Sequence, residues 1–307
     1  MSHITAGDIT PIGQIAESTY GTTPAGAFTY LEDVREGGNI TPTDNPNPYI
    51  NYRYTANGKR TFDAADYVSQ QKDAGYNAAV EVRDTAGWSA ILQYGGLASS
   101  DSYLASLPSR SVQFGYKQDS NNTAYALTYR GCKTDQLKIA ADAPGGIVKF
   151  DEVVMAAIRD PGATAFVTAP AASSVPAVQW IGAVNMYANG VTTTIYPQSF
   201  TITIKNNLAR SRAWDTGAST SKTVALLEGR QEIEMELTLW MEDFAEMLNN
   251  MDNTGGRIIA LSMGTTETVT LTGTAYMMAD GTNHALVQDQ QVQTVRLRLS
   301  SLYYTVA

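Results

Sequence analysis

Polar and apolar residues alternate along several stretches of this chain, most regularly over residues 232–240. The odd positions of this stretch carry the apolar residues Ile233, Met235, Leu237 and Leu239. The even positions begin with three acidic residues, Glu232, Glu234 and Glu236. Because successive side chains of a β-strand point to opposite faces, this pattern predicts a strand with one buried face and one acidic face.

The same alternation recurs elsewhere and indicates a mainly β protein. It is clear at residues 200–204, 268–272 and 295–299. Val, Thr and Tyr, which fit a pleated and half-buried surface, are abundant throughout the chain. Further strands are predicted at residues 78–83, 112–117, 123–129, 136–140, 147–155, 257–263, 268–278 and 292–303.

Two short segments show helical spacing instead. Asp243 is suited to cap a helix whose apolar residues fall three and four positions apart, at Phe244, Met247, Leu248 and Met251. In the first half of the chain, Trp88, Ile91 and Leu92 repeat this spacing. Each segment follows a predicted strand and precedes a Gly-Gly pair, which is suited to ending a helix.

The order of strand, short helix, Gly-Gly pair and further strands therefore occurs twice. Between the two occurrences, residues 161–178 are rich in Pro, Ala and Ser, a composition typical of a linker. We predict two similar β-sandwich or barrel domains, residues 1–160 and 179–307, each with one short helix, because halves of this length match the usual size of a domain. The likeness is one of element order, which two unrelated β-domains could also share.

Two segments lack a regular pattern. Residues 36–75 contain Pro42, Pro46, Pro48 and an Asn-Gly turn signal, and residues 206–221 are small and polar around Trp214. Long structureless segments within compact domains are usually functional, so we expect contacts with a neighbouring copy, or else mobile surface loops. The candidate contact residues in the second segment are Asn206, Arg210, Arg212, Trp214 and Asp215.

Composition limits the function classes. Hydrophobic residues make up 43% of the chain and charged residues only 17%, which favours a surface partly covered by partners. The net charge of −9 and the absence of a basic run argue against binding the nucleic-acid backbone. The single cysteine, Cys132, excludes an intrachain disulfide. No apolar run reaches the roughly 18 residues that span a membrane, and the absence of a leader pattern predicts a cytoplasmic chain.

Catalytic, metal and cofactor chemistry finds little support in the residue types. His3 and His284 are the only histidines, which disfavours a zinc site or a histidine-based triad, and no phosphate-binding glycine loop precedes a helix. We therefore expect no cofactor and no metal.

The three glutamates of residues 232–236 leave a glycosidase as one enzymatic alternative. Residues two apart on a strand are roughly 7 Å apart, within the range that paired catalytic carboxylates use. Three like charges in a row repel one another unless cations oppose them across the sheet, and Arg296 and Arg298 are suitably spaced. We favour a charged ladder or an acidic surface, or else a channel wall along which a polyanion slides.

Several motifs carry a family resemblance. They are Glu17-Ser18-Thr19-Tyr20-Gly21-Thr22-Thr23-Pro24, the strand-to-helix step around Trp88, Gly131-Cys132, the strand at residues 200–207, and Gly229-Arg230-Gln231 before the acidic strand. In their order, over about residues 9–303, the chain resembles the tail tube proteins, or major tail proteins, of tailed bacteriophages and related viruses.

The resemblance implies a structural, non-enzymatic subunit of the virion tail, assembled in the host cytoplasm. Such subunits form stacked rings around a lumen lined by sheets that close into a continuous barrel, and viral DNA passes through it without specific binding. Family rings usually hold six one-domain copies. A chain with two tail-tube-like domains could build the ring from three copies with pseudo-sixfold symmetry, which we favour over a plain hexamer. The implied partners are the chain itself and tape measure, terminator and sheath proteins.

One alternative from another class stays open. A carbohydrate-binding β-sandwich or adhesin would account for the tyrosine content and for Trp180 and Trp214.

Overall fold

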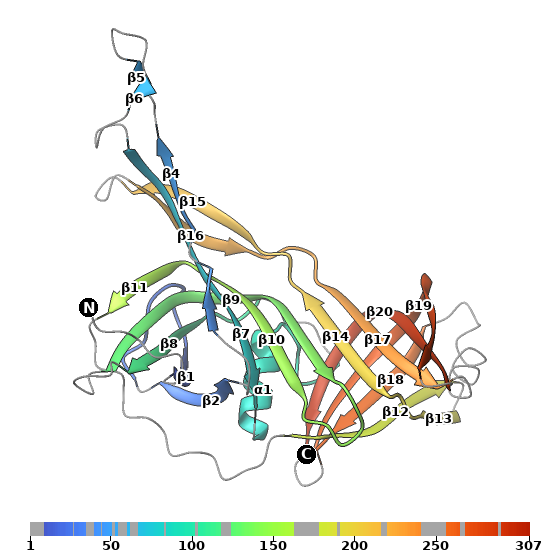
Figure 1. The fold of residues 1–307 in the computed structure, drawn as a ribbon. Coiled ribbons are helices and arrows are strands. Elements are labelled where there is room, and N and C mark those ends of the chain that lie inside the picture. Colours follow the sequence, from blue (N-terminus) through green and yellow to red (C-terminus); the bar gives the residue numbers. More distant parts are fainter. Residues whose placement is uncertain are drawn as a thin grey trace.

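The structure, a computed structural model, describes residues 9–26, 28–34, 40–43, 45–50, 53–54, 60–61, 67–82, 84–101, 104–117, 124–162, 178–188, 191–215, 220–240, 256–264, 268–287 and 290–307. Within these residues, eighteen strands join into one large sheet network, and two more form a separate pair. One helix, α1 (Thr85–Tyr94), accompanies them. The predicted mainly β fold class is confirmed (Figure 1).

A first group of six strands closes on itself. Its members are β7 (Tyr67–Glu81), β10 (Lys149–Ala156), β9 (Ala124–Ala141), β8 (Arg110–Lys117), β1 (Ile9–Ala16) and β2 (Thr29–Val34). In this order each strand pairs with the next, always antiparallel, and β2 returns to β7. Closure leaves few free edges within the group.

A second group shows the same order of pairing. Its members are β17 (Glu232–Trp240), β20 (Gln290–Val306), β19 (Val269–Val287), β18 (Arg257–Met263), β12 (Trp180–Ala188) and β13 (Val191–Ile195). Each again pairs with the next in an antiparallel manner. After β13 the chain runs back alongside β17. The Gln198 amide donates to the Thr238 carbonyl, and β14 (Ser199–Lys205) pairs with β17.

The two groups join edge to edge. β14 pairs on its other side with the C-terminal half of β9, from Phe200 opposite Ala141 to Lys205 opposite Gln136. At the far end of the first group, β3 (Ile40–Pro42) pairs with β7, and β11 (Ile158–Gly162) pairs with the N-terminal half of β9. One continuous sheet therefore runs from β3 through β7, β10, β9, β14, β17 and β20 to β19.

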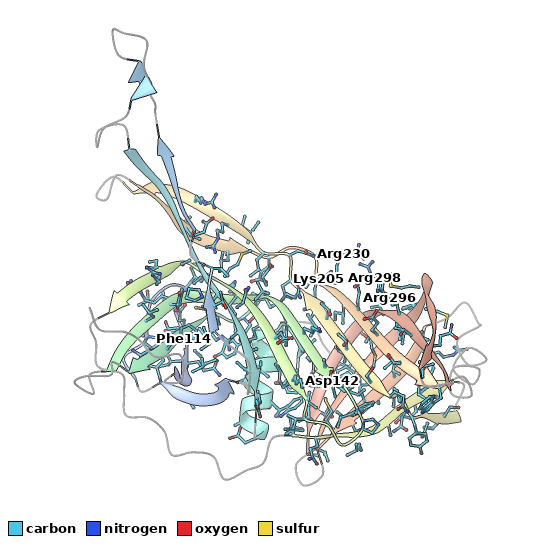
Figure 2. The ribbon with its side chains drawn as sticks, in the orientation of Figure 1. Phe114, Asp142, Lys205, Arg230, Arg296 and Arg298 are labelled. Carbon is cyan, nitrogen blue, oxygen red and sulfur yellow. The ribbon has the colours of Figure 1, made fainter. Side chains whose placement is uncertain are left out.

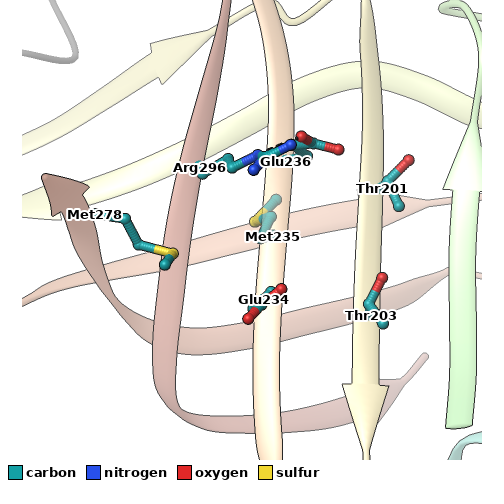
Figure 3. A pocket seen from close by; sticks show the side chains of 7 residues that line it. All are labelled: Thr201, Thr203, Glu234, Met235, Glu236, Met278 and Arg296. Atoms are coloured by element: carbon teal, nitrogen blue, oxygen red, sulfur yellow. Dashed lines mark hydrogen bonds and ion pairs between the residues drawn. The ribbon is translucent and has the colours of Figure 1, made fainter. Parts of the chain in front are cut away.

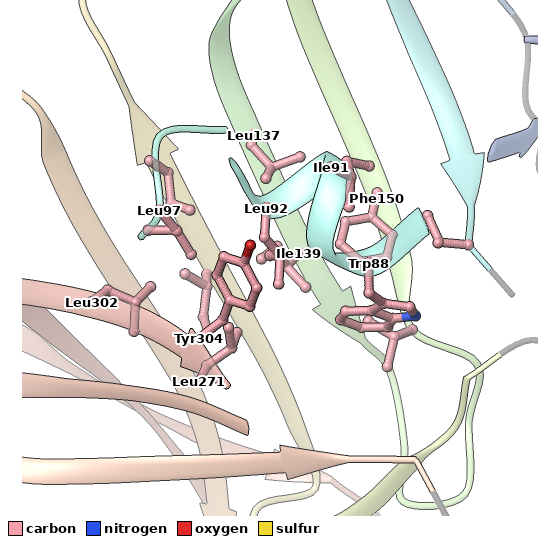
Figure 4. Close-up of a cluster of buried hydrophobic side chains, with 14 of the residues drawn as sticks. Trp88, Ile91, Leu92, Leu97, Leu137, Ile139, Phe150, Leu271, Leu302 and Tyr304 are labelled. Carbon is pink, nitrogen blue, oxygen red and sulfur yellow. The ribbon is translucent and has the colours of Figure 1, made fainter. Parts of the chain in front are cut away.

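The main hydrophobic core of the described residues extends through both groups of strands. It follows from the alternation in the sequence, since β10, β14 and β17 bury every second residue. Helix α1 fills the space between the groups (Figure 4). Trp88, Ile91 and Leu92, all fully buried, face strand residues of the first group, and the Tyr304 hydroxyl of β20 donates to the Ser89 carbonyl. Each buried aromatic or aliphatic side chain of this size contributes about 1.5–3 kcal/mol.

Helix α1 ends at the Gly-Gly pair, as its sequence predicts, and an aspartate caps its start. The Asp84 carboxylate accepts a hydrogen bond from the Gly87 amide at 2.6 Å and caps the first turn. The helix ends at Gly95, where an added Cβ would lie only 2.4 Å from Leu137. The matching helix that we predicted at residues 244–251 lies outside the described residues.

Strand β9 corrects one expectation. The sequence predicts two strands, at residues 123–129 and 136–140, but the structure has one strand of 18 residues. Its N-terminal half pairs with β8 and its C-terminal half with β10 and β14. Gly131, at φ 64°, lies between the halves, and this positive φ lets the strand bend from one neighbour to the next without ending.

The two segments expected to be irregular contain hairpins instead. β4 (Asn45–Ile50) pairs with the start of β7, and β15 (Ala209–Asp215) pairs with β16 (Thr220–Leu227). The small pair β5 (Arg53–Tyr54) and β6 (Arg60–Thr61) lies between β4 and β7. Pro46 and Pro48 made β4 hard to predict from the sequence. Among the described residues β4 pairs only with β7, and proline is tolerated in such an edge strand.

The structure describes only the two ends of the expected linker at residues 161–178. Pro161 and Gly162 belong to β11, where they pair with Leu127 and Ala126 of β9. The rest of this segment up to residue 177 lies outside the described residues.

Candidate functional site

The strongest candidate surface is the polar face of the continuous sheet. On β17, Ile233, Met235 and Leu237 are buried, while Glu232, Glu234 and Glu236 occupy the alternate, partly exposed positions. Their neighbours are β14 on one side and β20 on the other. Lys205, Arg296 and Arg298 lie on these two neighbouring strands, near one another in Figure 2.

Ion pairs link the glutamates to the last strand. Arg296 lies opposite Glu236, and its Nε is 2.7 Å from Glu236 Oε1. Arg298 lies opposite Glu234 and reaches diagonally to Glu232, with 3.3 Å between Nη2 and Oε1. These side chains are 35–55% exposed. Each such pair contributes only about 0.2–1 kcal/mol to stability.

The strand registers align the charges in rows across five strands. One row runs Asp151, Lys138, Thr203, Glu234 and Arg298, from β10 to β20. The next runs Lys149, Ala140, Thr201, Glu236 and Arg296. A third places Lys205 opposite Glu232. Every glutamate of β17 thus has a cationic residue directly opposite it on a neighbouring strand. The strand is acidic, as predicted, but the sheet face that it belongs to is not.

A shallow hollow lies in this face. It has a volume of about 250 Å³ and is lined by Thr201, Thr203, Glu234, Met235, Glu236, Met278 and Arg296 (Figure 3). The carboxylates of Glu234 and Glu236 line it together, with the Arg296–Glu236 ion pair at one side. Among the described residues, no cluster of three His, Cys, Asp or Glu side chains is suited to hold a metal ion.

The residues that the sequence proposed for contacts between copies lie at the base of the β15–β16 hairpin and along β15. They have different environments. Asn206 is buried, and its Nδ2 donates to the carbonyls of Gly95 and Thr134 at 3.0 and 2.9 Å, while its Oδ1 accepts from Gln231. It therefore anchors the second group of strands to the end of α1 and to β9. This internal position differs from the intermolecular contact expected from the sequence.

Arg210 and Arg212 attach the β15–β16 hairpin to β7. Arg210 donates to the carbonyls of Ala156 and Ala74, each at 2.6 Å. Arg212 Nη2 donates to both oxygens of Asp73, at 2.8 and 3.1 Å. Burial lowers the pKa of the Arg210 guanidinium, and the Asp73 carboxylate opposes this shift. Both arginines hold the base of the hairpin in place.

Trp214 and Asp215 lie farther out on β15, opposite Ser221 and Thr220 of β16. There the two hairpins run side by side, since Ser221 of β16 contacts Gln71 of β7 in a parallel bridge. Figure 1 shows both hairpins projecting together from the body of the protein.

A family profile described as phage tail tube protein matches residues 7–300 of the chain. The chain belongs to this family. The match covers both groups of strands, the charged sheet face and both projecting hairpins. It places the chain among non-enzymatic structural proteins of the phage tail, which self-assemble. The glycosidase alternative is therefore set aside. A comparison with curated proteins found no match.

Two motifs that carried the resemblance to tail tube proteins meet in the structure. The Glu17 carboxylate accepts hydrogen bonds from the Gly131 amide at 2.8 Å, the Ser111 hydroxyl at 2.6 Å and the Gly21 amide at 2.8 Å. Thr23 also contacts Ser111, at 3.0 Å. The segment at residues 17–24 therefore covers β8 and fixes the bend of β9 at Gly131.

Sequence reasoning missed a buried ion pair in this tail tube protein. Arg110 of β8 donates to both carboxylate oxygens of Glu152 on β10, each at 2.8 Å, and to Gln14 Oε1 at 2.5 Å. The Tyr94 ring lies 4.5 Å from the guanidinium. The available signal was a glutamate at an inward position of β10, between Phe150 and Val154, where alternation predicts an apolar residue.

No helix in the described part of the chain combines the length and apolar character needed to cross a membrane.

Proposed function

We propose that this chain forms stacked rings around a lumen that conducts the viral genome into the host, with the polar face of the continuous sheet toward the lumen. The observation that carries the proposal is this sheet, which runs through both strand groups with one face buried and the other polar. A sheet of this kind suits the wall of a tube, because its buried face packs on the core and its other face meets water.

The charge rows suit the passage of DNA. A strongly cationic wall would bind the phosphate backbone, and a strongly acidic wall would repel it. Each glutamate of β17 lies opposite a cationic residue on this face, so neither sign dominates along this strand and its neighbours. This balance replaces the acidic channel wall suggested by the sequence.

The repeated order of strand pairing supports two similar tail-tube-like domains, residues 1–160 and 179–307. β7, β10, β9, β8, β1 and β2 correspond in order to β17, β20, β19, β18, β12 and β13. Each chain then supplies two units to the ring. Three copies would give pseudo-sixfold symmetry, and six copies are the alternative.

The paired hairpins suit contact between successive rings. They project from the body, and Arg210, Arg212 and Asp73 fix their base. In this proposal their outer parts, including Trp214 and Asp215, contact the next ring. The ring faces that end the tube would meet terminator proteins, the lumen would hold the tape measure protein, and a sheath protein would cover the outside where the tail has one. Assembly would take place in the host cytoplasm.

Electron microscopy of the purified chain tests this function. Negative-stain images are expected to show rings or tubes, and averaged end views are expected to show three copies with pseudo-sixfold order. A chain that stays monomeric at high concentration would overturn the proposal. Sixfold order with six separate copies would keep the tube but remove the two-unit ring.

The charge balance has a separate test. The triple variant Glu232→Gln, Glu234→Gln, Glu236→Gln leaves Lys205, Arg296 and Arg298 on the face without their acidic neighbours. Tubes of this variant, assembled with a short labelled duplex, are expected to retain DNA at 50 mM salt and release it at 200 mM. Wild-type tubes are the control and should retain little at either concentration. Equal retention by both proteins would place the lumen on another face.

A further inference from the structure

The junction between the two strand groups gives a pattern for the junction between copies. Within the chain, β14 pairs with residues 136–141 of β9 over six successive positions. Additional bonds secure it: the Asn206 amide donates to the Asp135 carbonyl, and the Leu208 amide donates to the Asp135 carboxylate at 2.7 Å. The second group thus attaches to the first through the free edge of a long strand.

β19 is the counterpart of β9 in the second group. The N-terminal part of each strand pairs with the strand before it, β18 or β8, and the C-terminal part extends further. In β9 that extension binds β14. In β19 the extension covers residues 276–287. Tyr276, Met277 and residues 282–287 pair with β20 on one side, and the register shifts between Met277 and Thr282. Among the described residues, no strand pairs with its other side.

The sequence of this extension offers no protection against pairing. Exposed edge strands usually carry lysine, proline or a cluster of charges that prevents association. Residues 276–287 read Tyr-Met-Met-Ala-Asp-Gly-Thr-Asn-His-Ala-Leu-Val and contain no lysine, arginine or proline. Beyond the register shift, residues 282–287 form a continuous edge, and its composition is suited to accept another strand.

The strand that corresponds to β14 in the first group is β3. β14 pairs with β17, and β3 pairs with the equivalent strand β7, both antiparallel. β3 is only three residues long, and its last residue, Pro42, can accept but not donate a backbone hydrogen bond in a further pairing. We propose that residues 276–287 of β19 in one copy pair with β3 of the next copy, repeating between chains the β9–β14 junction within the chain. This inference rests on the proposed ring, since a head-to-tail contact between different surfaces closes only into a ring or continues as a filament.

The registers narrow the contact to a few positions. Thr201 lies opposite Ala140 in the internal junction, and Thr41 occupies the comparable position on β3, opposite Asn77 of β7. On β19, Asn283 and Ala285 lie opposite Thr294 and Val292, which continue the polar-face positions of β20. Thr41 of one copy is therefore expected opposite residue 283, 285 or 287 of its neighbour.

Thiol crosslinking tests this junction directly. Double variants would combine Thr41→Cys with Asn283→Cys, Ala285→Cys or Val287→Cys, and tubes would be treated with a short bismaleimide. At one of the three positions we expect a ladder of covalent multimers on a denaturing gel, ending at the ring size. Cys132 is fully buried, so it does not react in the folded chain.

Two controls make the result decisive. The pair Ala140→Cys and Thr201→Cys should crosslink within one chain, because these residues are opposite each other in the internal junction. A mixture of the two single variants of the successful pair should give dimers only, since each copy then carries one reactive end. Circular dichroism identifies any variant that fails to fold, and the neighbouring positions then replace it.

The possible outcomes separate the inference from the proposed function. If rings form and the internal control crosslinks but none of the three pairs yields multimers, the β19–β3 junction is overturned and the tube stands. If the wild-type chain forms neither rings nor filaments, the tube and the junction both fail.

Discussion

Two arginine–glutamate pairs in this chain have nearly equal lengths and very different environments. Arg110 and Glu152 are 2.8 Å apart with side chains 1% and 0% exposed. Arg296 and Glu236 are 2.7 Å apart with side chains 55% and 40% exposed. The buried pair must compensate for the removal of two charges from water, whereas the exposed pair keeps most of its hydration. Distance alone therefore says little about what an ion pair does.

The places of the two pairs in the fold explain the difference. Arg110 and Glu152 connect β8 to β10, two strands that do not pair with each other but lie across the closed first group. Arg296 and Glu236 lie on paired strands that hydrogen bonds of the backbone already hold together. The first pair fixes how the strands close, and the second sets the charge of a surface.

Removing one member of the buried pair should have the largest effect. Glu152→Ala leaves the Arg110 charge buried with its main acceptor gone, and the free energy of unfolding should fall by about 3–5 kcal/mol. Guanidinium unfolding of unassembled subunits measures this. The matched control replaces both members, Arg110→Met with Glu152→Leu, and should lose much less because no charge is left buried. A loss below about 1 kcal/mol for Glu152→Ala would contradict the comparison.

The exposure of the Glu17 side chain is intermediate between that of the buried pair and that of the exposed pair. Its half-buried carboxylate binds the Gly131 amide, the Ser111 hydroxyl and the Gly21 amide. Glu17→Ala leaves these donors without their acceptor and should cost about 1–3 kcal/mol by the same unfolding measurement. Glu17→Gln keeps one acceptor oxygen and should cost less. If the two variants unfold alike, the hydrogen bonds do not carry the effect.

The sequence predicted strands best where buried and exposed residues alternate along a single strand. β17 has the predicted bounds because its buried residues recur with period two. β18 also has the predicted bounds, although three successive residues, Ile259, Ala260 and Leu261, are buried in it. The projecting hairpins were missed because pairing at the edge, with Pro46 and Pro48 in β4, leaves no such pattern. β9 was divided in two because Gly131 reads as a break, although its positive φ only bends the strand.

The candidate site was predictable only in part, because register is a property of pairs of strands. The opposition of Arg296 and Arg298 to the glutamates could be proposed from spacing alone. Lys138 could not, since β9 meets β14 only through the junction between the groups. Lys205 could not either, since its place opposite Glu232 depends on the pairing of β14 with β17. For the same reason Asn206 was expected outside, although three hydrogen bonds hold it inside.

Alkaline pH should weaken the core beside the buried pair. Cys132 lies opposite Arg110 on β9, and burial raises the pKa of its thiol well above the ordinary value. The folded chain therefore keeps the proton while the unfolded chain loses it near pH 8.5. This contribution to stability is complete below that pH and is lost as the pH rises above it, by up to about 1.4 kcal/mol per pH unit.

Unfolding at several pH values between 8 and 9.5 checks this, with Cys132→Ala as the control. The variant has no thiol to titrate, so its unfolding free energy should fall less steeply than that of the wild type, whatever its starting value. Equal slopes would show that the thiol does not couple folding to pH. The range stops below pH 10 because burial also raises the pKa of Tyr20.

The exposed pair should show the smallest effect. A double-mutant cycle with Glu236→Gln and Arg296→Gln should give a coupling energy of about 0.2–1 kcal/mol, because water and side-chain entropy offset most of the attraction. The coupling should shrink further in 1 M salt, where screening acts over about 3 Å. A coupling above about 2 kcal/mol that resists salt would mean that this face is desolvated in the unassembled subunit. The polar face would then behave like the core, and its assignment to a water-filled lumen would lose its physical basis.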